Sequence, residues 1–436
     1  MDPNRGKAIV VGLGATGQAV TRHLVAEGWT VVIVEDRADE GTAEMAQRLG
    51  ATLGSAGDAA GAQLVVPSPG VGPHHPVHEA AASAGVPVLS EVELAWRSSP
   101  ATQLVAVTGT NGKTTVTTLL AAMVVESGRT AVAAGNIGLP LIEAVHQGVE
   151  VVVAEVSSFQ LQYTESFRPA VAVWLNLAED HLDWHPTMEH YAAAKQRIWA
   201  GQGSDDVAVV NAEDELVCSA AASAPGRVVT FGLGLGDYHL DGDVLSAPQG
   251  RQIMARKDLR RSLPHDVANA LAATAAAEAV GVSLDACRAV LATFDGLPHR
   301  LQLVLDAGDV RYYDDSKATT PASVLAALRG FDSVVLIAGG RNKGLDLGVL
   351  RQEAHRLRAV VAIGEASSAV ASAFEDTVPV IAAASMDAAV GAARHVARAG
   401  DVVVLSPGCA SFDWYRSYSE RGDDFVAAVH RLEAVT

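Results

Sequence analysis

The chain has 436 residues, of which 49% are hydrophobic and 19% charged, and this composition excludes a disordered chain and predicts a well-packed globular protein. A length prior of about 150 residues per domain predicts three domains. The formal net charge of −18 disfavours nonspecific nucleic-acid binding, because the average field repels a polyanion, although a local pocket could still take a small phosphorylated substrate.

The first segment predicts a strand, a glycine-rich turn, a helix and a second strand. Residues 8–11 and 30–34 are apolar runs, and Gly12, Gly14 and Gly17 follow the first of them. This spacing is typical of a phosphate or pyrophosphate site at a helix N-terminus, which a uridine-diphosphate sugar satisfies as well as a dinucleotide. A tight packing turn is the structural alternative. The candidate substrate contacts of this segment are Gly14, Ala15, Thr16, Glu35, Asp36 and Arg37.

Further apolar runs at 64–66 and 86–89 continue the alternation as far as a predicted linker at 98–100. We therefore expect a first domain over residues 1–99. A turn in this part could form another pocket loop or be only a turn. Its candidate substrate contacts are Ser68, Pro69 and Gly70.

Neither targeting nor disulfide signals stand out along the chain. The first residues lead into a strand without a signal-like apolar core, and no run approaches ~18 apolar residues. The sequence therefore predicts a cytoplasmic protein without membrane insertion. The three cysteines, Cys218, Cys287 and Cys409, are odd in number and widely spaced, with no Cys-x-x-Cys, so they do not support a zinc ribbon or a disulfide framework.

A second glycine-rich turn lies between the apolar run 104–107 and a helix-like stretch at 116–123. Backbone N–H groups and the helix dipole there would face nucleotide phosphates, Lys113 would add a charge, and the Thr114 hydroxyl could ligate magnesium. The usual template has glycine where Val107 stands, so this is a variant loop. The candidate ATP contacts are Gly109, Thr110, Asn111, Gly112, Lys113, Thr114 and Thr115.

After this loop, apolar runs predict a parallel sheet with crossover helices. The predicted strands are residues 132–134, 151–154, 171–175 and 207–210. Glu155 directly follows one of them, at the edge where such sheets bind ligands, and with Thr114 it offers hard oxygen ligands for magnesium. A surface carboxylate is the alternative. Ser157 and Ser158 leave the same edge, and an alanine-rich helix over 269–279 closes the unit before a break at 296–299.

Two histidines and a lysine follow the strand at 171–175. The spacing of His181 and His185 would suit zinc on a helix, but Pro186 and the lack of a glutamate base argue against a metalloprotease. Magnesium or substrate contacts are the better interpretation, with one histidine structural. Lys195, taken alone, would be a solvated helix lysine.

The last part restarts the pattern with strands at 334–338, 359–363 and 402–405. The predicted fold class is therefore α/β, with three consecutive α/β domains. An N-terminal Rossmann-like domain (1–99) precedes a central P-loop ATPase-like domain with a mostly parallel sheet (100–298), and a C-terminal Rossmann-like domain (299–436) follows.

Taken together, these motifs resemble the Mur ligases over nearly the whole chain. The phosphate loop is common to the superfamily, including folylpolyglutamate synthases, so it does not select the substrate. Residues 155–161, 315–319 and 405–413, with Arg421, Gly422 and Phe425, resemble the D-glutamate-adding branch. Two positions depart from that pattern: Asp266 stands where asparagine is common, and Tyr418 where phenylalanine is common.

The resemblance implies a set of residue roles. Lys113 would hold the β- and γ-phosphates of ATP, Thr114 and Glu155 one magnesium, and His181 with a carbamylated Lys195 a second. Asn269 would contact adenine, Arg300 an ATP phosphate, Asp315 the ribose, and Asn136 the uridine-linked substrate. Residues around the reacting carboxylate and D-glutamate would be Lys317, Thr319, Lys343, Ser411 and Tyr418. The implied catalytic residues are Lys113, Glu155, His181, Lys195 and Lys317.

The implied activity is ATP-dependent addition of D-glutamate to UDP-N-acetylmuramoyl-L-alanine (UDP-MurNAc-L-Ala) through an acyl phosphate, in peptidoglycan precursor synthesis. We expect a monomer that uses ATP and two magnesium ions. A folylpolyglutamate synthase is a second interpretation, but the βαβ segment before the phosphate loop argues against it. A third interpretation is an NAD-dependent dehydrogenase or a nucleotide-binding regulatory module. It would explain the glycines from Gly12 to Gly17, but it would not explain the loop around Lys113.

Overall fold

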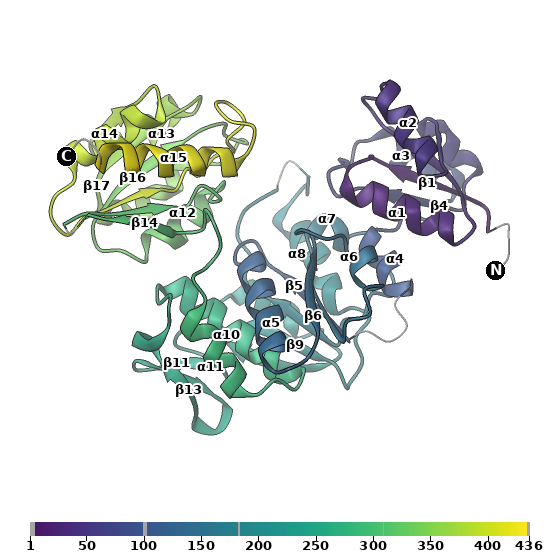
Figure 1. Cartoon of the computed structure of the whole chain (residues 1–436), viewed down its shortest axis with the longest axis horizontal. Coiled ribbons are helices and arrows are strands. Elements are labelled where there is room, and N and C mark those ends of the chain that lie inside the picture. Colours follow the sequence, from purple (N-terminus) through teal and green to yellow (C-terminus); the bar gives the residue numbers. More distant parts are fainter. Residues whose placement is uncertain (1–4, 99–102, 182–183, 308, 434–436) are drawn as a thin grey trace. The chain divides into compact units, whose positions relative to one another are not determined.

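The computed structural model describes residues 5–98, 103–181, 184–307 and 309–433, so part of the predicted linker at 98–100 lies outside the described residues. The chain folds into two compact units (Figure 1). Unit 1 comprises residues 1–177, 181–260 and 267–293, and unit 2 comprises residues 178–180, 261–266 and 294–436.

The first sheet of unit 1 has four parallel strands in the order β3-β2-β1-β4. Alternate residues of β1 face opposite sides: Ala8 and Val10 join one apolar cluster, Ile9 and Val11 another. The run 86–89 pairs with Val65 through a single bridge and does not extend into a strand. Pro87 has no N–H to donate, which agrees with this short pairing. The elements are β1 (Lys7–Val11), α1 (Ala15–Ala26), β2 (Thr30–Val34), α2 (Glu40–Arg48), β3 (Thr52–Leu53), η1 (Ala56–Gly61), β4 (Leu64–Pro67), α3 (Pro76–Ala84) and α4 (Glu91–Ser98).

The central sheet of unit 1 has six strands in the order β10-β9-β8-β5-β7-β6, and every neighbouring pair is parallel. Its four inner strands, β9, β8, β5 and β7, consist mainly of buried valine and alanine, as is typical of parallel strands covered on both faces. The elements are β5 (Gln103–Thr108), α5 (Lys113–Glu126), β6 (Ala131–Gly135), α6 (Leu141–Ala144), β7 (Val151–Glu155), α7 (Ser158–Leu161), β8 (Val171–Trp174), α8 (Met188–Gln196), η2 (Arg197–Trp199), β9 (Val207–Asn211), α9 (Glu215–Ala221) and β10 (Arg227–Phe231).

The end of the central region differs from the sequence expectation. The predicted helix 269–279 begins earlier, at Pro264, which suits the first turn of a helix, and a further helix follows it. A small antiparallel sheet, β11-β12-β13, was not predicted, since its strands are short and partly polar. The elements are β11 (His239–Asp241), β12 (Val244–Ala247), η3 (Pro248–Gly250), β13 (Arg251–Ala255), η4 (Arg256–Asp258), α10 (Pro264–Ala279) and α11 (Leu284–Thr293).

One apolar cluster runs through unit 1 from the first sheet to the central sheet. It includes Val10 of β1, Val92 and Ala95 of α4, Leu141 of α6 and Ala106 of β5. Because these side chains share one core, the two sheets form a single compact unit. The predicted segments 1–99 and 100–298 each have a main sheet of their own, and their boundaries stay a prediction.

Unit 2 contains a six-stranded sheet in the order β14-β15-β19-β16-β17-β18, in which only β14 runs antiparallel to its neighbour among the described strands. Val334 and Leu336 of β16 pack into one apolar cluster, and Val335 and Ile337 into the cluster on the opposite face. The predicted α/β fold class is thus confirmed. The elements are β14 (Gln302–Asp306), β15 (Arg311–Asp314), α12 (Pro321–Leu328), β16 (Val334–Gly339), η5 (Leu347–Arg356), β17 (Leu357–Ile363), α13 (Ser367–Ala373), β18 (Val380–Ala382), α14 (Met386–Val396), β19 (Val402–Leu405) and α15 (Tyr418–Glu433).

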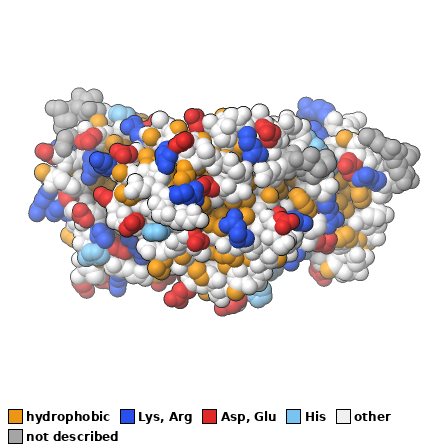
Figure 2. Space-filling model, turned by 90° about the horizontal axis from the view of Figure 1, so that it is seen from below, with side chains coloured by type: hydrophobic (Ala, Val, Ile, Leu, Met, Phe, Trp, Pro, Cys, Tyr) orange, Lys and Arg blue, Asp and Glu red, His pale blue; other side chains and the backbone are white. Residues whose placement is uncertain are grey.

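Acidic, basic and apolar side chains are interspersed over the face shown in Figure 2. That face therefore presents no broad surface of one sign for a polyanion. Within the described residues, no helix has the length and apolar character needed to cross a membrane.

Candidate active site

The phosphate loop joins the end of β5 at Thr108 to the start of α5 at Lys113. Gly109 and Gly112 have φ values of +153° and +84°, a region that residues with side chains rarely adopt. A Cβ on Gly112 would lie 2.6 Å from the Asn269 Oδ1 atom, and one on Gly109 would lie 3.0 Å from the Leu175 Cβ atom. The glycines thus let the loop pass close to both side chains, and they leave the first N–H groups of α5 at the sheet edge, as in anion sites.

Lys113 folds back over this loop. Its Nζ atom donates to the carbonyl oxygens of Gly109 at 2.8 Å and Thr110 at 2.9 Å. The Asn176 side chain braces the same loop, since its Oδ1 accepts from the Asn111 N–H at 2.8 Å and its Nδ2 donates to the Asn111 carbonyl at 3.1 Å. Sequence reasoning missed Asn176, although its place directly after the predicted strand 171–175 was a signal.

Glu155 brings together three of the predicted residues. It is the last residue of β7 and only 3% exposed. Its Oε2 accepts from the Thr114 hydroxyl at 2.6 Å, and its Oε1 accepts from the Asn136 Nδ2 at 3.1 Å. Gly135 permits this approach, because a Cβ there would lie 2.3 Å from the Glu155 carbonyl oxygen. The hydroxyl and the carboxylate form a hard oxygen pair that fits Mg²⁺ when phosphate oxygens and water complete the coordination.

Lys195 lies on α8 and is 1% exposed, so it is not the solvated lysine that its sequence neighbours suggest. Its Nζ donates to the Gly109 carbonyl at 2.9 Å and lies 4.7 Å from the centre of the Tyr191 ring. Lys195 and Lys113 therefore approach the same loop carbonyl. As an ammonium, Lys195 cannot ligate a metal, so the implied second magnesium requires the carbamate.

The two histidines have different surroundings. His181 has a positive φ of 56° and its ring packs edge-on against Phe159 at 4.6 Å between centroids. His185 is buried, and its Nε2 lies 2.9 Å from the Ser158 hydroxyl oxygen. Because the His181 backbone is not helical, the pair lacks the helix face that the zinc interpretation requires. Ser157 caps α7 by accepting from the Gln160 N–H at 3.3 Å.

The first glycine turn is built for close packing and keeps an open helix start. A Cβ on Gly17 would lie 1.9 Å from the Gly12 carbonyl oxygen, whereas one on Gly14, which precedes α1, would meet nothing within 4 Å. The Glu35 Oε2 accepts from the Leu13 N–H at 2.8 Å and so braces this turn. The remaining predicted contacts here border the open end of α1 or the end of β2: Ala15, Thr16, Asp36 and Arg37.

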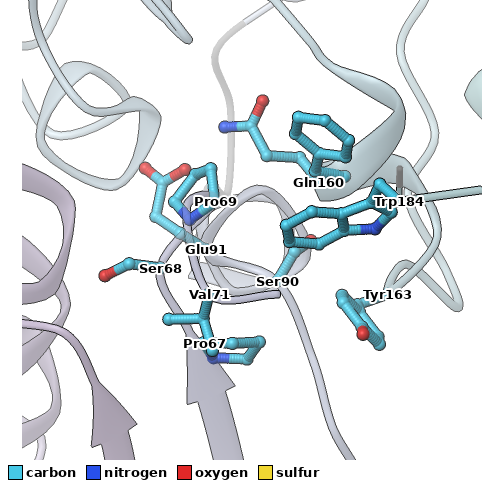
Figure 3. Close-up of a pocket in the computed structure, with 10 residues that line it drawn as sticks. Pro67, Ser68, Pro69, Val71, Ser90, Glu91, Gln160, Tyr163 and Trp184 are labelled. Carbon is cyan, nitrogen blue, oxygen red and sulfur yellow. The ribbon is translucent and has the colours of Figure 1, made fainter. Parts of the chain in front are cut away.

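A pocket of unit 1 lies beside the predicted substrate turn (Figure 3). It is small and partly open to solvent. Of the predicted contacts, Ser68 and Pro69 line it, and Gly70 follows them in the turn. The other lining residues, none predicted, are Pro67, Val71, Ser90, Glu91, Phe159, Gln160, Tyr163 and Trp184.

Glu91 in this pocket is 1% exposed, and burial raises the pKa of its carboxyl to about 7, with nearby Glu143 adding to the rise. Because this pKa lies above the ordinary value of 4.5, the contribution of Glu91 to stability is complete below pH 4.5 and is lost as the pH rises through 7. We predict that Glu91→Gln is more stable than the parent at pH 8, by on the order of 3 kcal/mol, and that the difference falls below ~1 kcal/mol at pH 5.

Urea unfolding of both proteins at the two pH values measures this difference. The Ile142 N–H donates a hydrogen bond to the Glu91 carboxyl. It keeps an acceptor in the variant, because the glutamine amide has a carbonyl oxygen. Tyr163 also lines the pocket and the charge of Glu143 acts on Glu91, and both residues are unchanged in the comparison. A stability difference that did not change with pH would contradict the prediction.

In unit 2, the predicted residues follow three neighbouring parallel strands. Asp315, Lys317 and Thr319 come after β15, Lys343 after β16, and Ser411 after β19. Since β15, β19 and β16 are adjacent and parallel, their carboxyl ends lie at one sheet edge, the usual place for ligands. Lys317 and Tyr418 meet directly, with the Lys317 Nζ 4.0 Å from the Tyr418 ring centre.

Asp315 is buried beside this edge. Burial raises the pKa of its carboxyl to about 7, although its Oδ2 accepts from the Ser406 hydroxyl at 2.8 Å and its Oδ1 from the Leu301 N–H at 3.2 Å. The charge of neighbouring Arg300 acts in the opposite direction and lowers that pKa. Two residues predicted to contact ATP thus lie near each other. Asp266 pairs with the Arg261 Nε at 3.0 Å, so one of its oxygens is already in use.

Arg421 supports the same edge from α15. It is 1% exposed and donates to the Ser316 hydroxyl at 2.9 Å, to the Ser316 carbonyl at 2.7 Å and to the Cys409 carbonyl at 3.1 Å. These bonds join the segment that carries Lys317 to the one that carries Ser411. The resemblance included Arg421 as a motif residue, and the structure supplies the physical reason for an arginine there.

The chain is similar to known proteins over nearly its whole length. Three family models match: "Mur ligase MurD-like, N-terminal domain" over residues 6–90, "Mur ligase middle domain" over 107–277 and "Mur ligase, glutamate ligase domain" over 299–409. A relative from Frankia casuarinae is 45% identical, with 98% of this chain and 94% of the relative covered. One from Desulfosudis oleivorans is 43% identical, with 98% and 96% covered. Both are named UDP-N-acetylmuramoylalanine--D-glutamate ligase.

Solved structures share the fold. UDP-N-acetylmuramate-alanine ligase MurC from Thermotoga maritima matches with a TM-score of 0.61 at 20% identity, covering 99% of this chain and 100% of that one. A pseudomurein peptide ligase type C from Methanothermus fervidus matches with a TM-score of 0.63 at 17% identity, covering 98% and 100%. With sequence matches over nearly its full length and this shared architecture, the chain belongs to the Mur ligase family.

Proposed function

We propose that this protein is an ATP-dependent ligase that joins D-glutamate to UDP-MurNAc-L-Ala in peptidoglycan precursor synthesis. The observation that carries the proposal is the Thr114–Glu155–Asn136 cluster beside a phosphate loop, in a chain that matches D-glutamate ligases over 98% of its length. ATP dependence follows from the family. The identity of the accepting substrate and of the amino acid comes from the names of the relatives.

The proposed reaction activates a carboxylate. An oxygen of the alanyl carboxylate attacks the γ-phosphorus of ATP, ADP leaves, and an acyl phosphate forms. The D-glutamate amine then attacks the acyl carbon, the nitrogen of the tetrahedral intermediate loses a proton, and the intermediate expels phosphate to leave an amide. Lys113 and Lys317 place positive charge where negative charge develops, which is where electrostatic stabilisation has most effect.

Magnesium ions would neutralise the phosphate oxygens when bound. Thr114 and Glu155 would hold the first ion, and the oxygen pair described above fits it. His181 and a carbamylated Lys195 would hold the second. The proposed role of Lys195 accounts for a buried lysine whose Nζ lies 2.9 Å from a phosphate-loop carbonyl.

Each substrate has its own group of residues in this proposal. Asn269, Arg300 and Asp315 bind ATP together with the phosphate loop from Gly109 to Thr115. The contacts to D-glutamate and the reacting carboxylate are Lys317, Thr319, Lys343, Ser411 and Tyr418. The contacts to the uridine-linked substrate are Gly14, Ala15, Thr16, Glu35, Asp36, Arg37, Ser68, Pro69, Gly70, Asn136, Ser157, Ser158 and His181.

We also place this activity in the cytoplasm, where ATP is available, and assign it to a monomer. Sedimentation of the purified protein under assay conditions tests the second statement, and a stable dimer would overturn it. Fractionation of cells of the source organism tests the first.

We predict that phosphate release from ATP, magnesium and UDP-MurNAc-L-Ala requires D-glutamate. L-Glutamate, L-alanine and a diamino acid should each give at least about tenfold lower stimulation. L-Glutamate holds its amine and carboxylates in the mirror-image arrangement, and the other two carry different side chains, so each leaves polar groups of the site unpaired. The measurement is steady-state phosphate release with each amino acid in turn. Stimulation by another amino acid and not by D-glutamate would refute the substrate assignment.

A further inference from the structure

The pocket between the substrate turn and α7 contains a carboxylate that the proposed reaction does not use. Figure 3 shows Glu91 and Ser68 on one side of this pocket and Trp184 and Tyr163 on the other. Glu91 begins α4, and the Ser68 turn follows β4. The pocket thus lies between the predicted uridine-substrate turn and the segment that continues from Glu155 into α7.

The two carboxylate oxygens of Glu91 differ in their hydrogen bonding. Its Oε1 accepts from the Ile142 N–H at 2.7 Å, at the start of α6. Its Oε2 is buried and has no hydrogen-bond partner among the residues that the structure describes. A buried carboxylate oxygen without a donor is costly, so its presence needs an explanation. A ligand that brings a hydrogen-bond donor into the pocket would supply one.

The unpaired oxygen narrows the choice of ligand. A diphosphate carries only acceptor oxygens at neutral pH, so it offers no hydrogen to the Glu91 Oε2, whose partner must be a donor. The pocket therefore suits the neutral part of a nucleotide-linked substrate. In UDP-MurNAc-L-Ala, the neutral donors are sugar hydroxyls and the amide N–H groups of the acetamido and alanyl links.

We propose that Glu91 is a specificity-determining residue for the uridine-linked substrate, whose sugar–peptide part donates a hydrogen bond from a hydroxyl or an amide N–H to the Glu91 Oε2. The proposal rests on the function proposed above. It gives Glu91 a second task besides holding the Ile142 N–H of α6, the helix that follows the Asn136 loop.

Glu91→Gln separates the two tasks. The glutamine oxygen can replace Oε1 as acceptor for the Ile142 N–H, which forces the amide NH₂ toward the position of Oε2. A donor would then face the donor of the substrate. We expect the KM for UDP-MurNAc-L-Ala to rise roughly tenfold to a hundredfold, because a buried donor loses its acceptor. The KM for ATP and the affinity for UDP alone should not change.

Glu143→Gln is the matched control, since it removes the neighbouring charge from a side chain that is 34% exposed and pairs with Arg22. It should leave every KM within about twofold. Binding of UDP-N-acetylglucosamine, which lacks the lactoyl-alanine, distinguishes the sources of the donor. Weaker binding of this ligand to Glu91→Gln assigns a sugar donor, and unchanged binding assigns the alanyl amide.

An unchanged KM for UDP-MurNAc-L-Ala in Glu91→Gln overturns the proposal and leaves water as the occupant of the pocket. Failure of the proposed function looks different, because the parent protein itself would then show no D-glutamate-dependent phosphate release. If the variant does not fold, the parent provides the test. The carboxyl ¹³C resonance of Glu91 should shift when UDP-MurNAc-L-Ala is added and not when UDP is added, and no selective shift overturns the proposal.

Discussion

Lys113→Ala is expected to lower D-glutamate-dependent phosphate release at least about a hundredfold, the usual scale for removing a group that stabilises charge in the transition state. The Lys113 ammonium lies over the phosphate loop, 2.8 Å from the Gly109 carbonyl and 2.9 Å from the Thr110 carbonyl. When ATP binds, its phosphate oxygens are stronger acceptors than these carbonyls, so the lysine exchanges partners. Alanine cannot supply that charge. The measurement is steady-state phosphate release at saturating substrates, with ATP affinity determined separately.

Lys257→Ala is the matched control for this prediction. Lys257 is an exposed lysine of η4, so the same chemical change there should leave turnover within about twofold. The Lys113 variant should also keep its thermal unfolding temperature within a few degrees. It loses only the two hydrogen bonds from the Lys113 Nζ to loop carbonyls, and this loop is only partly buried. Near-normal turnover of Lys113→Ala would refute the assignment of the loop to ATP.

The sequence predicted the parts of the fold in which local pattern and environment agree. β5, β7 and β8 are buried on both faces, so each is a short run of apolar residues. The positive φ values of Gly109 and Gly112 favour glycine, so the positions of these glycines in the sequence predict the phosphate loop. Glu155 could be found for a related reason: a carboxylate that ends a buried strand lies at the binding edge of a parallel sheet.

The sequence could not predict contacts between residues far apart in the chain. Glu93 lies on a helix whose charged residues look solvated, yet it is fully buried, and the N–H groups of Glu165, Ser166 and Phe167 that donate to it offset the cost of its burial. Glu91 is buried for the same kind of reason, through Ile142. No periodicity within α4 encodes these partners. The short strands β11 to β13 were missed because their residues have no continuous apolar face.

Lys195 is the residue for which family resemblance and burial point to the same unusual chemistry. Its side chain is 1% exposed and donates to the Gly109 carbonyl at 2.9 Å, close to the proposed metal ligands. Reaction of the neutral amine with CO₂ forms an N–C bond and releases a proton, and it leaves a carboxylate on the nitrogen. The lysine then supplies oxygen ligands to a cation in place of a competing positive charge.

We predict that Lys195→Ala lowers turnover at least about a hundredfold and that acetate or formate partly restores it, because a small carboxylate can occupy the space of the missing carbamate. Lys113→Ala is the matched control: it lacks a cation, so the same acids should not restore its turnover. The parent protein provides a second measurement, since its turnover should fall in CO₂-depleted buffer and recover with bicarbonate. A fully active Lys195→Ala variant would exclude the carbamate, and a loss that no carboxylic acid reverses would leave Lys195 as a support of the Gly109 carbonyl.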